Sequence, residues 1–201
     1  MATASYQIHP TGESSVSIEL LRTGLRRRKH ILFFQHYQGD LTYDPDVPER
    51  TNFTIRVSVG SMVCRDAWLK PPARQAVVSS FADLLKSQDC PYLELRSQAL
   101  ESSGRHRASV TGALTFHGTT APAQLEATIV PVGNDKLELN LAGTFGLTSY
   151  DVRPPKAWWG GPSINDVARV RFLLWPAKTS KAEDPRLAIT NANGQRSVAA
   201  D

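Results

Sequence analysis

The sequence predicts an all-β protein of about eight antiparallel strands, arranged as a closed barrel or a sandwich, with a single helix. Apolar residues recur at every second position through most of the chain, as in strands with one buried face. Several of these runs exceed ten residues, and long strands suit a barrel, where each strand tilts around the axis. One segment has helical spacing instead.

The N-terminal half holds three alternating runs, at 15–21, 31–43 and 53–59. The run at 31–43 is interpreted as one long strand with His36, Gln38 and Asp40 on its polar face. The apolar face of the three runs is predicted to consist of Val16, Ile18, Leu20, Ile31, Phe33, Tyr37, Leu41, Tyr43, Phe53, Ile55, Val57 and Val59.

The helical segment is PPARQAVVSSFADLLKSQ, in which Val77, Val78, Phe81, Leu84 and Leu85 recur at helical spacing. The two prolines that precede it are typical of a helix start. We expect an amphipathic helix over 73–86 whose apolar face covers the open end of the barrel.

The C-terminal half holds the remaining runs, at 92–97, 108–117, 123–130, 136–149 and 168–174. Their predicted inward residues are Leu93, Leu95, Val110, Leu114, Phe116, Leu125, Ala127, Ile129, Leu137, Leu139, Leu141, Phe145, Leu147, Val170, Phe172 and Leu174. The link at 150–166 carries Trp158 and Trp159, for which a lid and simple packing on the barrel end are equally open interpretations. Residues 1–177 are predicted to form the barrel domain and 178–201 a polar extension.

Composition narrows the function classes. The 201 residues carry a formal net charge of +4, which does not by itself indicate nucleic-acid binding. The basic cluster RRRKH at 26–30 is either a phosphate-binding patch or, the favoured interpretation, a solvated loop between strands. The two cysteines, Cys64 and Cys90, form no CxxC pair, and no secretory signal is seen. We therefore expect a cytoplasmic protein, or a periplasmic one if this is a mature form.

Sequence motifs for catalysis are not found: there is no GxSxG, HExxH, phosphate loop or GxGxxG. His30 and His36 lie six positions apart, too far along a strand to bind one ion together, and His9, His106 and His117 have no nearby acidic or cysteine partner in the sequence. The prediction is therefore no enzyme, no catalytic residue, no metal site and no cofactor. His117 lies at a turn and points away from the apolar face, so we expect it to fix this hairpin by hydrogen bonding.

Four stretches together resemble the YceI-like family. GALTFHGTT at 112–120 resembles the family's turn signature, and LLKSQDCPYLELRS at 84–97 resembles its helix end and following strand. YQGDLTYDPDVP at 37–48 resembles a family strand end, and SINDVARVRFLLWPA at 163–177 its last strand. The resemblance runs in order from Tyr6 to Ala177. It implies an eight-stranded antiparallel, lipocalin-like β-barrel with one amphipathic helix capping an end.

The resemblance also implies a function: binding, sequestration or transport of an elongated apolar small molecule, such as an isoprenoid, a quinone or a fatty-acid-like lipid. Nucleic acid is not an expected partner, whereas a transient membrane contact and a homodimer are left open. The alternative is a protein-interaction module with a filled core. The predicted ligand-binding residues are Phe33, Tyr37, Phe53, Ile55, Phe81, Leu85, Leu114, Phe116, Leu139, Phe145, Trp158, Trp159 and Phe172.

Overall fold

The fold is known from a computed structural model that describes residues 3–23, 28–154 and 164–179. Its strands all pair antiparallel in a single sheet. The N-terminal elements are β1 (Ala4–Ile8), β2 (Ser15–Arg22), β3 (Lys29–Phe34), β4 (Tyr37–Tyr43), β5 (Asn52–Ser58), β6 (Met62–Cys64) and the helix α1 (Pro71–Leu84). The C-terminal strands are β7 (Tyr92–Gly104), β8 (Arg107–Phe116), β9 (Thr119–Val132), β10 (Lys136–Gly146), β11 (Ile164–Leu174) and β12 (Ala177–Lys178). Short 3-10 turns are η1 (Pro48–Arg50), η2 (Val59–Ser61) and η3 (Leu147–Tyr150).

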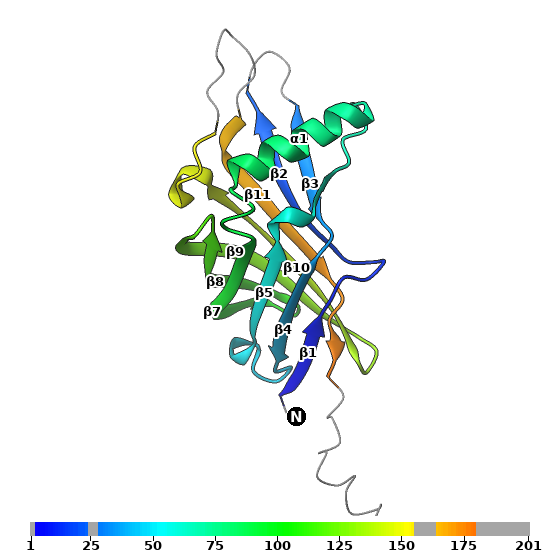
Figure 1. The fold of residues 1–201 in the computed structure, drawn as a ribbon. Coiled ribbons are helices and arrows are strands. Elements are labelled where there is room, and N and C mark those ends of the chain that lie inside the picture. Colours follow the sequence, from blue (N-terminus) through cyan, green and yellow to red (C-terminus); the bar gives the residue numbers. More distant parts are fainter. Residues whose placement is uncertain (1–2, 24–27, 155–163, 180–201) are drawn as a thin grey trace, which may run out of the picture.

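The sheet closes into a barrel, as predicted. Eight strands form a ring in the order β12, β1, β4, β5, β7, β8, β9 and β10. The short strand β12 closes this ring, because it pairs with β1 on one side and places Ala177 opposite Lys136 of β10 on the other. Strands β11, β2, β3 and β6 continue the sheet from β10, and α1 crosses them near one end of the barrel (Figure 1).

The core follows the predicted alternation in most strands. Across β9, β10 and β11, Ala127, Leu141 and Phe172 are register partners, and all three are buried. The same inward face continues through β8 with Val110, Leu114 and Phe116, and through β5 with Phe53, Ile55 and Val57. Since these strands bury one side and expose the other to solvent, their inward residues form one hydrophobic core inside the sheet.

The predicted single strand at 31–43 is wrong in one respect, and this corrects the placement of Phe33. The chain bends at Gln35 and His36, where both backbone N–H groups donate to Ser61 Oγ. The bend shifts the alternation by one residue, so Leu32 and Phe34 fill the core while Phe33 is only half-buried. Phe33 instead lies under the Arg65 guanidinium, 5.1 Å from its ring centroid.

Helix α1 covers one end of the barrel, as predicted, but begins at Pro71 and ends at Leu84 rather than spanning 73–86. Pro71 and Pro72 occupy its first turn, where a missing N–H is tolerated. Phe81 is buried, and Leu85, just past the helix end, is buried too. No helix in the described part of the chain has the length and apolar character needed to span a membrane.

The β8–β9 hairpin turns at His117 and Gly118, both with positive φ, at 52° and 77°. This pair of positive φ values is typical of the tight primed turns that join antiparallel strands. His117 Nδ1 lies 3.2 Å from the carbonyl oxygen of Tyr150, so the ring ties the hairpin to η3. The structural role predicted for His117 therefore holds, with a partner far along the chain rather than within the turn.

Candidate functional site

An apolar groove of about 390 Å³ lies between α1 and the strand ends that it covers. We call it the helix groove. Its apolar wall consists of Trp68, Leu69, Ala73, Ala76, Val77, Phe81, Leu84 and Ile164, and its polar wall of Arg22, His30 and Ser80. A volume of this size falls in the range of small-molecule pockets, which are typically 300–1,000 Å³.

The helix creates this groove by its pattern of large and small side chains. Ala73, Ala76, Val77 and Ser80 share one face of α1 with Phe81 and Leu84, since residues three and four apart are neighbours on a helix. Phe81 packs into the barrel end and anchors the helix. The small side chains one turn earlier leave space open that larger ones would fill. The groove is therefore a consequence of the alanines in the first half of α1.

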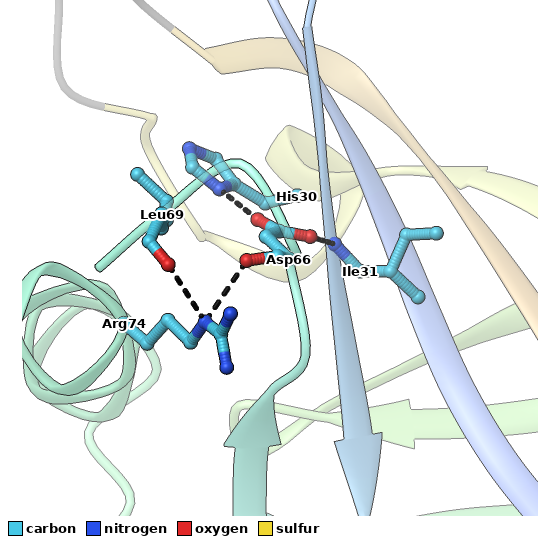
Figure 2. A network of polar contacts seen from close by, with 5 residues as sticks. All are labelled: His30, Ile31, Asp66, Leu69 and Arg74. Atoms are coloured by element: carbon cyan, nitrogen blue, oxygen red, sulfur yellow. Dashed lines mark hydrogen bonds and ion pairs between the residues drawn. The ribbon is translucent and has the colours of Figure 1, made fainter. Parts of the chain in front are cut away.

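A buried polar network holds the segment between β6 and α1 in place (Figure 2). His30 Nδ1, from β3, lies 2.8 Å from Asp66 Oδ2, and Asp66 Oδ1 accepts a hydrogen bond from the Ile31 N–H at 3.2 Å. On the helix side, Arg74 Nε donates to the carbonyl oxygens of Asp66 and Leu69, at 2.9 and 3.0 Å. The network thus joins β3, the link and α1, and it fixes the His30 ring in the groove wall.

Cys64 completes a cluster with this pair. The ligand atoms of His30, Cys64 and Asp66 lie within 4.8 Å of one another, and all three residues are buried. Nitrogen, sulfur and oxygen donors in this combination suit Zn²⁺, so this is the part of the described chain that could hold such an ion. Burial, with the adjacent Asp66 carboxylate, raises the pKa of the Cys64 thiol. Both carboxylate oxygens already accept hydrogen bonds, and the network is complete without an ion.

The inward side chains of the barrel are closely packed, and several of them, such as Leu95, Leu139 and Leu141, are fully buried. Leu114, Phe145 and Phe172, all predicted to contact a ligand, line an interior cavity together with Leu95 and Val170, but its volume is only about 10 Å³. Phe116 packs edge-to-face against Phe145 and Tyr150 beside it. The sequence predicted which residues face inward, and the structure places them around a nearly closed space.

The other predicted site residues lie in separate places. Phe81 is the one that lines the helix groove, whereas the core residues Phe53, Ile55, Leu85 and Leu139 line neither the groove nor the interior cavity. Tyr37 borders a polar pocket near His9 and His36. Trp158 and Trp159 lie outside the described residues.

Sequence reasoning missed the polar groove residues and Trp68. His30 and Asp66 are thirty-six positions apart and meet only because β3 pairs with β6. The link CRDAWLKPP at 64–72 has no periodicity that would single it out. The signal that was available is Trp68 itself, a large aromatic residue in a short polar link, which the structure shows to be partly exposed.

Comparison with known proteins agrees with the fold. The sequence model of the YceI-like domain matches residues 6–174. A UPF0312 protein of Pseudomonas putida strain GB-1 is 29% identical over 129 residues, which are 62% of this chain and 64% of the relative. A UPF0312 protein of Pseudomonas fluorescens strain SBW25 is 29% identical over 141 residues, 67% of each chain. The chain thus spans slightly less than two thirds of the first relative's length.

Solved structures with the same fold include BcnA of Burkholderia cenocepacia, with a TM-score of 0.66 and 15% identity over 80% of this chain and 95% of that one. Another is described as a polyisoprenoid binding domain from Saccharophagus degradans implicated in plant cell wall breakdown. Its TM-score is 0.62, with 8% identity over 86% of this chain and 98% of the other. At these identities the likeness concerns the fold.

Proposed function

This chain belongs to the YceI-like domain family, and on that premise we propose that it is a non-enzymatic binding protein for a long-chain apolar molecule. The helix groove carries the proposal, because it is a concave apolar surface of about 390 Å³ at the end of a barrel. The Saccharophagus degradans neighbour, described as polyisoprenoid binding, adds support for an isoprenoid-like ligand.

The chemistry of the groove suits such a ligand. Each methylene that leaves water for an apolar wall contributes roughly 0.8 kcal/mol, so a long hydrocarbon chain can bind without directed polar contacts. Trp68, Val77 and Leu84 offer such a wall, and Ala76 leaves the space for the chain.

A filled-core interaction module is the second candidate. The observation that favours it is the interior cavity of only about 10 Å³. On that hypothesis the groove would be a surface recess that another protein covers, and no small apolar molecule would bind with useful affinity.

Titration of the full chain with farnesol, a neutral isoprenoid alcohol, tests the proposal by calorimetry. We expect saturable binding, and we expect Ala76→Trp to weaken it by about tenfold or more, since the indole would occupy the groove. Gln75→Trp is the matched control, because Gln75 lies on the exposed side of the same helix turn and should leave binding unchanged.

Two results would count against the proposal. Farnesol that fails to bind the wild-type chain would favour the interaction module. Binding that survives in a folded Ala76→Trp variant would move the ligand out of the helix groove. Thermal unfolding of both tryptophan variants shows whether they remain folded.

A further inference from the structure

Two arginines stand side by side at the mouth of the helix groove. Arg22 is the last residue of β2, Arg28 directly precedes β3, and the Arg22 N–H donates to the Arg28 carbonyl oxygen at 2.8 Å. Both guanidinium carbons lie over the Trp68 ring, 5.7 Å and 4.6 Å from its centroid. Trp68 and Arg22 line the groove, and Arg28 adjoins it through its contact with the Trp68 ring.

Neither guanidinium has a carboxylate partner among the residues that the structure describes. The nearby Lys29 is different, because it pairs with Glu19 at 2.9 Å. The Asp66 carboxylate is buried and already accepts hydrogen bonds from His30 and Ile31. Arg22 and Arg28, both half-buried, therefore bring two positive charges to the edge of an apolar wall, and no carboxylate of the described residues pairs with them.

Contact with the Trp68 ring keeps the N–H donors of these guanidinium groups available to an anion. A guanidinium that stacks on an aromatic ring uses its face, while its N–H donors point outward in its plane. Those donors match the oxygens of a phosphate or carboxylate, which they can bind in pairs. The aromatic contact also restricts the side chains, so less conformational freedom is lost when an anion binds.

We propose that the helix groove selects a single-chain amphiphile with an anionic head: the head binds Arg22 and Arg28, and the apolar tail lies along Ala73, Ala76 and Val77. This inference rests on the proposed function and narrows its ligand class. For the basic cluster at 26–30, the position of Arg28 supports the phosphate-binding interpretation over the solvated loop that the sequence favoured. The occupant is one molecule in the groove, because the charges adjoin a concave apolar wall rather than a flat surface.

Farnesyl phosphate and farnesol, which share one tail, test this by calorimetry on the full chain. We expect the wild-type protein to bind the phosphate about tenfold more tightly, with a preference that shrinks in about 1 M salt. Arg22→Gln combined with Arg28→Gln should abolish the preference, because farnesyl phosphate loses two cationic donors, whereas farnesol carries no charge and should be weakened far less. Arg169→Gln combined with Arg171→Gln is the matched control, since it removes the same charge from exposed positions of β11.

The outcomes separate the two proposals. Equal affinity for both probes in the wild type, or a preference that survives in the Arg22/Arg28 variant, would overturn the anionic head while leaving apolar binding in place. A preference that disappears equally in the control variant would make it an effect of net charge and overturn it too. Failure of both probes would refute the proposed function itself. Binding to anionic phosphatidylglycerol vesicles without binding to farnesyl phosphate would replace the inference with a membrane contact.

Discussion

Removal of the Asp66 carboxylate should destabilise the fold more than removal of an exposed one. Asp66 accepts from His30 Nδ1 at 2.8 Å and from the Ile31 N–H at 3.2 Å, and the His30 and Asp66 side chains are only 8% and 4% exposed. Asp66→Ala therefore leaves a buried ring nitrogen and a backbone N–H without a protein acceptor. Because the network joins β3 to α1, the change should lower the stability of the whole fold (Figure 2).

The size of the effect follows from the two lost hydrogen bonds. A hydrogen bond to a charged group contributes about 1.5–3 kcal/mol, and an orphaned buried donor costs about 1–3 kcal/mol. If each of the two lost bonds is counted once, at about 1.5–2.5 kcal/mol, Asp66→Ala lowers the free energy of unfolding by about 3–5 kcal/mol. In a chain of this size that corresponds to a fall in Tm of roughly 6–20 °C.

Urea denaturation followed by circular dichroism measures this difference. Asp40→Ala is the matched control: Asp40 is exposed, and its side chain accepts from Gln7 at 2.6 Å. We expect the control to lose less than about 1 kcal/mol, as for other exposed polar contacts. Equal losses in the two variants would show that the His30–Asp66 contact does not support the fold, and the reasoning on the groove wall would fail with it.

Two further changes test the barrel. Gly39→Ala should lower the free energy of unfolding by about 2 kcal/mol or more, because a Cβ at this position would overlap the backbone carbonyl oxygen of Thr54 on β5. Gly12→Ala is the control: a Cβ there meets open space, so the same urea assay should show little change. His117→Ala and His117→Gly both remove the contact to Tyr150, but the glycine variant should be about 1 kcal/mol more stable, since the backbone at this turn has a φ of 52°. A glycine variant that is the less stable of the two would contradict the turn assignment.

Period-two alternation predicted the barrel well because every ring strand except the two-residue β12 has one buried face. Val110, Leu114 and Phe116 are inward at the positions that the pattern indicates, and the helix was recognised by its different period. Phe33 was misplaced because the pattern records only parity. The bend at Gln35 and His36 moves the inward side chains from odd to even positions before it, and nothing in the neighbouring sequence indicates this. The Ser61 hydroxyl that supports the bend comes from another segment.

The shortest strands and the site were beyond the reach of the same reasoning. Strand β12 spans only two residues, too few for alternation to be visible, yet it closes the ring. The groove depends on how α1 meets the ends of β2, β3 and β11, and its charged edge depends on Trp68 reaching Arg22 and Arg28. Such contacts between distant segments leave no periodic trace in the sequence.

The contrast between the two apolar spaces decides where a long tail should lie. The groove offers about 390 Å³, whereas the interior cavity offers about 10 Å³ between packed side chains such as Leu114 and Phe172. A tail that stays in the groove gains roughly 0.8 kcal/mol per methylene, about a fourfold rise in affinity for each one. A tail that enters the barrel must first displace core side chains, at about 1–3 kcal/mol or more. Affinity for straight-chain alcohols of increasing length should therefore rise and then level off once the groove is full; a rise that continues would mean that the barrel opens to the ligand.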